Sequence, residues 1–165
     1  MKFIADRTLG KLARKLRVLG FDAVYWGGGN LEGACKTALM EGRVLLTRSR
    51  KIREKSGDLQ VLVIEANNPR EQIRETLSKL QLQPAAEKFF SRCLMCNQDL
   101  LSIPKEEAEG KVPDFIYRLY DSFHVCPRCH RLYWPGTHLQ RMKKEMEGAI
   151  PGLPPSLFEV TKVHS

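Results

Sequence analysis

Four of the five cysteines in this 165-residue sequence occur as two C-x-x-C pairs. The segments RCLMCNQDL and HVCPRCHRL supply them, as Cys93, Cys96, Cys126 and Cys129. Two ligands three positions apart can turn around one ion, and two such turns complete a tetrahedral zinc site of four thiolates. Because four thiolates leave no open coordination position, the pattern predicts a structural zinc ion. A pair of disulfides, or an iron centre held by the same sulfurs, is the alternative.

A second group of polar residues follows short apolar runs in the first third of the sequence. Asp6 follows KFIA, while Arg48, Ser49 and Arg50 follow RVLLT. Glu32 comes just after the loop GGGN. Ligands of parallel sheets bind beyond the carboxyl ends of the strands, so we expect these residues near one edge. One or two carboxylates can hold Mg²⁺ or Mn²⁺ together with waters and substrate phosphates.

Both acids also have simpler interpretations. A carboxylate at the start of a helix is stabilised by the backbone in any case. Asp6 would then be a helix cap or an ion-pair partner of Arg7 or Arg48, and Glu32 an acid of a first helical turn.

Positive charge is concentrated at the start of the chain. The formal net charge is +8, and residues 1–59 hold 13 Lys and Arg against 6 Asp and Glu. One face of the helix expected at 7–19 is basic, through Arg7, Lys11, Arg14 and Lys15. Such a surface favours a polyanion partner, most simply nucleic acid. A solvated surface that serves only solubility is the alternative.

Apolar periodicity predicts the elements that would position these residues. Strands are expected at 2–5, 23–26, 43–47 and 59–65, and helices at 7–19, 31–41 and from 69 onward. This alternation favours an α/β fold with a mostly parallel sheet flanked by helices. Residues 1–82 would form that domain, 83–90 a connector, and 91–142 the cysteine module. The Pro- and Gly-containing tail, 143–165, is expected to be poorly ordered or to lie along the surface.

Other residues near the cysteines are weaker candidates. His124 and His130 are candidate ligands, although four cysteines already complete a site. Tyr133 or Trp134 would stack on a base, and for Trp134 packing on the zinc module is the favoured alternative. Cys35 lies on the apolar face of its helix and is expected to be a buried structural cysteine.

The sequence also bears on the compartment. No apolar run approaches the length of a membrane span. The start, MKFIADRTLGK, lacks the long apolar segment of a signal peptide. A cytoplasmic protein is therefore expected, and paired cysteines in a reducing compartment favour metal over disulfides.

Several long motifs together resemble the mutator-seven exonuclease C-terminal domain family. They are FIADRTLGKLARKLRVLGFD, EGRVLLTR, a late C-x-x-C pair and CPRCHRLYWPGTH, and the resemblance spans residues 1–142. Members of this family join a PIN-like nuclease fold to a zinc ribbon and are regarded mainly as predicted ribonucleases. PIN-type nucleases use a small cluster of acids to hold magnesium or manganese ions that activate water.

The resemblance places this sequence's acids in the family pattern with one departure. Asp6 matches the first acid of the family, and Glu32 lies near the position of the second. The third acid normally follows the third strand in a T-R-D pattern, where this sequence has Thr47, Arg48 and Ser49. The resemblance therefore implies weak binding of Mg²⁺ or Mn²⁺ and slow cleavage.

Three functions are compatible with these patterns. In a metal-dependent ribonuclease, Asp6 and Glu32 would bind the ion, Arg48 and Arg50 would neutralise the phosphate, and the basic helix face would follow the RNA backbone. A non-catalytic RNA-binding protein would retain the nuclease fold without needing a divalent ion. A protein-interaction module on a ribonucleoprotein would have little RNA affinity of its own. RNA is thus the expected partner, and a protein partner is the alternative.

Overall fold

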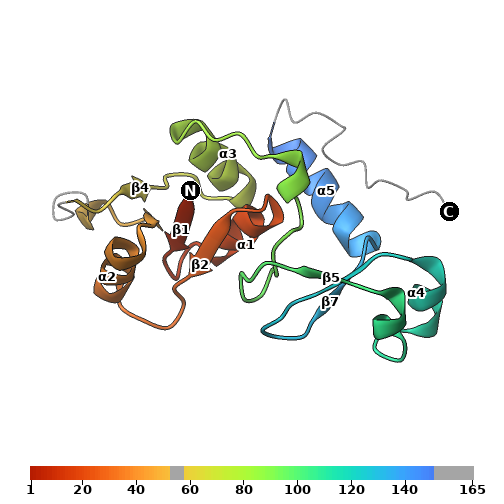
Figure 1. Ribbon diagram of the computed structural model, residues 1–165. Coiled ribbons are helices and arrows are strands. Elements are labelled where there is room, and N and C mark those ends of the chain that lie inside the picture. The colour runs from red at the N-terminus through yellow and green to blue at the C-terminus, as the bar shows by residue number, and fades with distance from the viewer. Residues whose placement is uncertain (53–57, 151–165) are drawn as a thin grey trace.

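The computed structural model describes residues 1–52 and 58–150 and contains two sheets, each with its own helices (Figure 1). The first sheet is parallel and has four strands in the order β2-β1-β3-β4. Its elements are β1 (Lys2–Ala5), α1 (Gly10–Val18), β2 (Asp22–Tyr25), α2 (Leu31–Glu41), β3 (Val44–Thr47), a 3₁₀ turn (Arg50–Ile52), β4 (Val61–Val63) and α3 (Pro69–Lys79). The predicted α/β class is confirmed.

Alternating side chains of the strands give the parallel sheet two apolar faces. Phe3 and Ala5 of β1 pack with the buried leucines of α1 and with Ile73 of α3. Ile4, between them, packs on the opposite face with Ala34 of α2 and with Leu45 of β3. Helices α1 and α3 therefore cover one face and α2 the other, which leaves the strand ends accessible at the edge.

Side-chain caps explain where the helices begin. Asn30 accepts a hydrogen bond from Gly33 N, and Asn68 accepts from Arg70 N and Glu71 N, so α2 and α3 start at the next residue. Helix α1 begins at Gly10, three residues later than predicted, because the Asp6 carboxylate binds Thr8 N and holds residues 6–9 in a turn.

The second sheet is antiparallel, with three strands in the order β5-β6-β7, and carries the cysteines. Between the cysteine pairs the chain forms β5 (Leu101–Ile103), a 3₁₀ turn (Lys105–Ala108), α4 (Asp114–Leu119) and β6 (Phe123–Val125). The third strand, β7 (Leu132–Tyr133), follows the second pair. Phe123 is fully buried in a small core that Trp134 also contacts, which supports the packing role expected for Trp134.

Helix α5 (Thr137–Ala149) joins the two sheets and differs from the expected tail. It lies between α3 and the antiparallel sheet in Figure 1, and it packs against α3. The predicted boundary at 142/143 falls inside this helix. The expectation of poor order is wrong for residues 143–149, because Met146 and Ala149 are buried in the main core. Residues 151–165 lie outside the described part of the chain.

The predicted connector also contains structure of its own. A 3₁₀ turn occupies Ala86–Lys88, and Phe90 N donates to Val18 O at the end of α1, at 2.9 Å. Phe89 and Phe90 pack against the main core. The segment 83–90 is therefore attached to the parallel sheet through α1.

Candidate nucleic-acid site and metal centre

The Asp6 carboxylate is held rigidly at the end of β1. Its Oδ1 accepts hydrogen bonds from Thr8 N at 2.8 Å and Thr8 Oγ1 at 2.6 Å. Its Oδ2 accepts from Thr47 Oγ1 at 2.6 Å and from Arg48 N at 3.4 Å. The residue is only 7% exposed. Donors from the neighbouring strand β3 thus fix an acid at the carboxyl edge of the sheet.

A hollow of about 520 Å³ opens beside this carboxylate. We call it the strand-end hollow, and it is lined by Asp6, Arg7, Thr8, Trp26, Gly29, Asn30, Leu31, Arg48 and Ser49. Three predicted site residues, Asp6, Arg48 and Ser49, therefore meet at one place. The parallel topology explains the meeting, because β1 and β3 are adjacent strands that end at the same edge.

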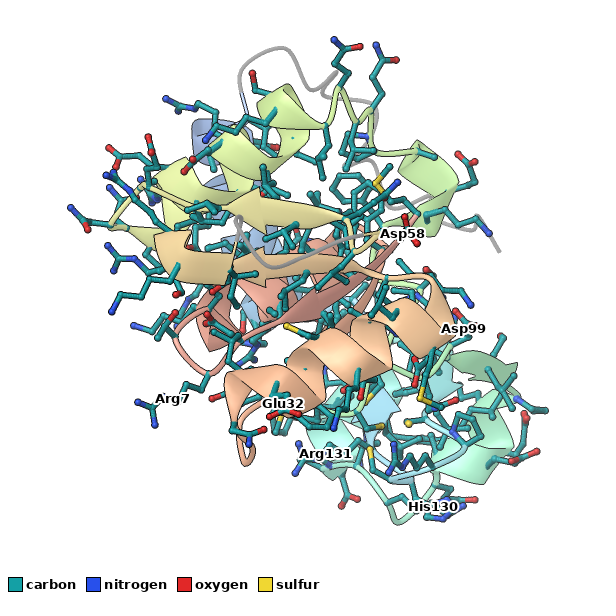
Figure 2. All side chains as sticks on the ribbon, turned by 90° about the vertical axis from the view of Figure 1, so that its left-hand side faces the viewer. Arg7, Glu32, Asp58, Asp99, His130 and Arg131 are labelled. Atoms are coloured by element: carbon teal, nitrogen blue, oxygen red, sulfur yellow. The ribbon has the colours of Figure 1, made fainter. Side chains whose placement is uncertain are left out.

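Glu32, the second candidate acid, points elsewhere. Its carboxylate pairs with Lys36 Nζ at 2.9 Å along the surface of α2, and both side chains are exposed. Hydrogen bonding to Lys36 lowers the pKa of Glu32. Figure 2 shows Glu32 on the outer side of α2, and it does not line the strand-end hollow. The geometry favours the simpler role of a first-turn helix acid.

The two arginines after β3 differ in their surroundings. Arg48 Nη2 donates to Asn67 Oδ1 at 2.6 Å, so its guanidinium joins the ends of β3 and β4. Arg50 belongs to the 3₁₀ turn and pairs with Glu65 at 3.3 Å on an exposed surface. Arg48 therefore faces the hollow beside Asp6, whereas Arg50 lies outside it.

Sequence reasoning did not single out Trp26, which forms one wall of the hollow. Its indole Nε1 donates to Asn30 O at 3.1 Å. A Cβ at Gly29 or Gly33 would lie within 2.9 Å of the indole ring, so glycine is needed at both positions for this placement. The sequence signal for this arrangement is the run GGGN directly after Trp26. Trp26 supplies a flat apolar surface next to a carboxylate and an arginine.

The basic face predicted for α1 is present, with one correction. Arg7, Lys11 and Arg14 are exposed, and Figure 2 shows Arg7 projecting from the surface. Lys15 is instead buried, and its ammonium pairs with Glu145 of α5. The expectation that Lys15 is exposed was wrong, because α5 packs over that side of α1. Its charge is neutralised within the protein.

The four cysteines form a group that can hold a metal ion such as zinc. Their sulfur atoms lie within 4.8 Å of one another, with Sγ–Sγ distances of 3.2 Å for Cys96–Cys126, 3.4 Å for Cys93–Cys96 and 3.6 Å for Cys93–Cys129. Zn–S bonds of about 2.3 Å in a tetrahedron place sulfurs about 3.8 Å apart, so the group fits zinc. All four are free thiols and not disulfides.

The surroundings of Cys93 favour its thiolate. Burial alone raises the pKa of this thiol, but hydrogen bonds with the Tyr133 hydroxyl and with the amides of Cys96 and Met95 outweigh burial and lower it to about 6. Tyr133 Oη lies 3.1 Å from Cys93 Sγ and accepts from Leu94 N at 3.2 Å. A deprotonated sulfur is the form that binds metal.

Comparison with known proteins identifies the family. The Mut7-C RNAse domain family matches residues 1–146. The chain belongs to this family. It is 32% identical over 103 residues to a human protein named exonuclease mut-7 homolog, an alignment that covers 59% of this chain and 12% of that protein. No solved structure shows significant similarity to the chain.

Membership of the Mut7-C family places the chain among nuclease-type domains. The alignment with this chain covers only 12% of the human relative's length. Across residues 1–52 and 58–150, none of the helices combines the length and the apolarity that crossing a bilayer requires.

In this Mut7-C domain, hydrogen bonds connect the turn of the first cysteine pair to α1 and β2. The buried Arg17 guanidinium donates to the carbonyls of Leu94 at 2.8 Å and Met95 at 3.0 Å, both between the paired cysteines. Asn97 Oδ1 accepts from Ala23 N of β2 at 3.0 Å. The turn that holds half of the metal site therefore shares hydrogen bonds with α1 and β2.

The histidines lie outside the metal group. His124 on β6 is half-buried, and burial lowers its pKa. His130 adopts φ 59° after the second cysteine pair, the left-handed conformation that closes this turn. His138 is exposed near the start of α5. Within the described residues, the metal-ligand group contains the four cysteines and no histidine.

Proposed function

We propose that this domain is a ribonuclease that binds RNA at the carboxyl edge of the parallel sheet and hydrolyses phosphodiester bonds slowly. The observation that carries the proposal is the fixed Asp6 carboxylate beside Arg48 in an open hollow, in a chain of the Mut7-C RNAse domain family. Arg48 would neutralise the scissile phosphate, and Trp26 would contact the adjoining base or sugar.

The hollow fits a divalent ion only as a weak site. Its described lining includes one carboxylate, Asp6, together with Ser49 and Asn30, whose Oδ1 already accepts the capping hydrogen bond from Gly33 N. Mg²⁺ can be held by one carboxylate when waters and substrate phosphates complete its shell. A bound Mg²⁺ or Mn²⁺ would supply an activated water and neutralise charge on the leaving oxygen. In this proposal Asp6 holds the ion and RNA contributes part of its shell.

A second candidate function, RNA binding without cleavage, has support from the same site. Asp6 accepts four hydrogen bonds, which occupy the lone pairs that an ion would use. Among the described residues that line the hollow, Asp6 is the only acid. RNA would then be held through the basic residues and the aromatic wall, with no need for a divalent ion.

The experiment compares cleavage of a labelled structured RNA in the presence of Mn²⁺ by wild type, Asp6→Asn and Ser49→Asp. The proposal predicts slow cleavage by wild type that Asp6→Asn abolishes and Ser49→Asp accelerates. Cleavage only by Ser49→Asp, with salt-sensitive RNA binding in wild type, would establish the binding function instead. If no protein in the set cleaves or binds RNA, both candidates are wrong and a protein partner becomes the interpretation to pursue.

A further inference from the structure

Two further hollows continue from the basic face of α1. The first, which we call the helix groove, has a volume of about 620 Å³ and lies between α1, the start of α3 and α5. The second, the ribbon hollow, has a volume of about 520 Å³ and lies on the zinc ribbon. Arg14 and His138 line both, so the two hollows share a wall and adjoin one another.

The helix groove also reaches toward the strand-end hollow. Asn68 and Arg70 line its α3 side. The adjacent Asn67 accepts the hydrogen bond of Arg48, which lines the strand-end hollow. A path therefore leads from Asp6 past Arg48 and Asn68, along α1, to the ribbon.

The charge of this path is strongly positive. Among the described residues, the three hollows are lined by eight Lys or Arg side chains and by two acids, Asp6 and Glu145. Glu145 is paired with Lys15, so these two charges cancel and the other seven cations face one acid, Asp6. Linear arrays of basic side chains of this kind follow a nucleic-acid backbone.

The ribbon hollow adds aromatic surface to this charge. Trp134 lines it and is half-buried, while Lys111 and Arg131 line it as exposed cations. His130 lines it as well, and Figure 2 shows His130 and Arg131 together on the ribbon. An aromatic ring flanked by cations is the arrangement that holds an unpaired base and its phosphate. A paired base does not expose its face in this way.

We infer that the ribbon hollow is a second RNA subsite, which takes an unpaired nucleotide of a single strand whose other end lies in the strand-end hollow. The inference rests on the proposed function for the identity of the ligand, but it does not require cleavage. It defines the substrate class as single-stranded RNA long enough to reach both hollows. Shorter strands occupy the strand-end hollow alone.

The test measures binding of oligouridine of roughly 4 and roughly 16 nucleotides, which are lengths that single-strand-binding folds cover. The double variant Lys111→Ala/Arg131→Ala is compared with Arg118→Ala/Lys144→Ala, which removes equal charge from exposed positions outside the three hollows. Zinc content and thermal unfolding establish that both variants are folded. Binding is measured over a range of salt concentrations without a chelator.

The ribbon variant should bind the long strand about tenfold more weakly than wild type and the short strand equally well, with a salt slope for the long strand smaller by about 1.4. The control variant should stay within about twofold of wild type for both strands. Equal losses in the two double variants, equal losses for the two strands, or absence of RNA binding by wild type would overturn the inference.

The two tryptophans of the chain give an independent readout, because Trp26 lines the strand-end hollow and Trp134 the ribbon hollow. In Trp26→Phe, only Trp134 remains, and its fluorescence should respond to the long strand and not to the short one. In Trp134→Phe, Trp26 should respond to both. A Trp134 signal that the long strand leaves unchanged would contradict the subsite.

Failure of the inference is distinguishable from failure of the proposed function. If the ribbon variant loses affinity for the long strand only and wild type does not cleave RNA, hydrolysis is rejected and the subsite is retained. Cleavage that depends on Asp6, with identical behaviour of the ribbon and control variants, would keep hydrolysis and reject the subsite.

Discussion

The two candidate metal sites of this domain are built in different ways. The cysteine site takes its ligands from two tight turns, and the four sulfurs meet within 4.8 Å. The strand-end site would need acids from separate elements, and it has Asp6 from β1 but Ser49 after β3 and an outward-facing Glu32 on α2. A structural site fails to fold when one ligand is lost, whereas an acid at a strand end can change without unfolding the sheet.

This comparison predicts its largest effect at the cysteines. Cys126→Ser should lose zinc and unfold the ribbon, because structural zinc supplies on the order of 10 kcal/mol of folding free energy in small metal-dependent units. Zinc content and thermal unfolding are the measurements. Cys35→Ser, a half-buried cysteine outside the site, is the matched control and should retain zinc. A Cys126→Ser protein that melts like wild type would show that the ribbon is stable without metal.

The second effect concerns the contact between the two regions. Arg17→Met should lower the free energy of unfolding by about 3 kcal/mol, because it leaves the carbonyls of Leu94 and Met95 without their charged donor. Burial lowers the pKa of Arg17, but the guanidinium remains protonated at neutral pH. Denaturant unfolding measures the loss. Arg17→Lys should recover little stability, since an ammonium cannot reproduce the fork of donors; full recovery would indicate that charge alone is required.

A third prediction concerns the exposed basic residues of α1. Lys11→Ala/Arg14→Ala should weaken binding of single-stranded RNA about tenfold and reduce the salt slope by about 1.4. Arg118→Ala/Lys144→Ala, which removes the same charge from exposed positions outside the three hollows, should stay within about twofold of wild type. Fluorescence anisotropy at several salt concentrations provides both quantities. Equal effects from the two double variants would mean that RNA is attracted by net charge alone.

The smallest effect is a pH dependence at the junction of the two sheets. The Asp22 carboxylate accepts hydrogen bonds from Arg43 and Asn97, which outweigh its burial and lower its pKa. The pKa of Asp22 is therefore lower in the folded state than in the unfolded state, where it is near 3.8. The ionised carboxylate stabilises the fold at pH values above the unfolded-state pKa. This stabilisation is lost as the pH falls through the folded-state pKa.

Asp22→Asn should therefore cost about 1 kcal/mol near neutral pH, and the difference from wild type should shrink as the solution is acidified below about pH 4. Urea unfolding across this pH range measures it. Asp121→Asn, which alters an exposed carboxylate paired with Lys105, should show no such convergence. If the difference in unfolding free energy between wild type and Asp22→Asn grew on acidification, the ionised Asp22 carboxylate would not be stabilising the fold.

Local signals explain why much of this structure was predictable. The C-x-x-C pairs specify their own site, and Asn30 and Asn68 cap helices that begin one residue later. The short apolar run in KFIA indicates a strand, and the structure adds that the strand is buried on both faces. Each of these features depends on residues close together in the sequence.

Other features depended on contacts between distant segments. Lys15 belongs to the polar side of α1 by sequence, and only the packing of α5 makes it buried. Trp26 becomes part of the site because two glycines allow its indole to lie over the loop. None of these arrangements has a periodic signature.

The most direct test of the incomplete strand-end site is to measure Mn²⁺ binding by the zinc-loaded domain, without RNA, using titration calorimetry. We predict weak binding in wild type, at least about tenfold tighter binding in Ser49→Asp, and none in Asp6→Asn. The reason is that Asp6 is the carboxylate that binds the ion in wild type, and Ser49→Asp adds a second carboxylate ligand. Tight Mn²⁺ binding by wild type that persists in Asp6→Asn would contradict the account, since the ion would then be held by other residues.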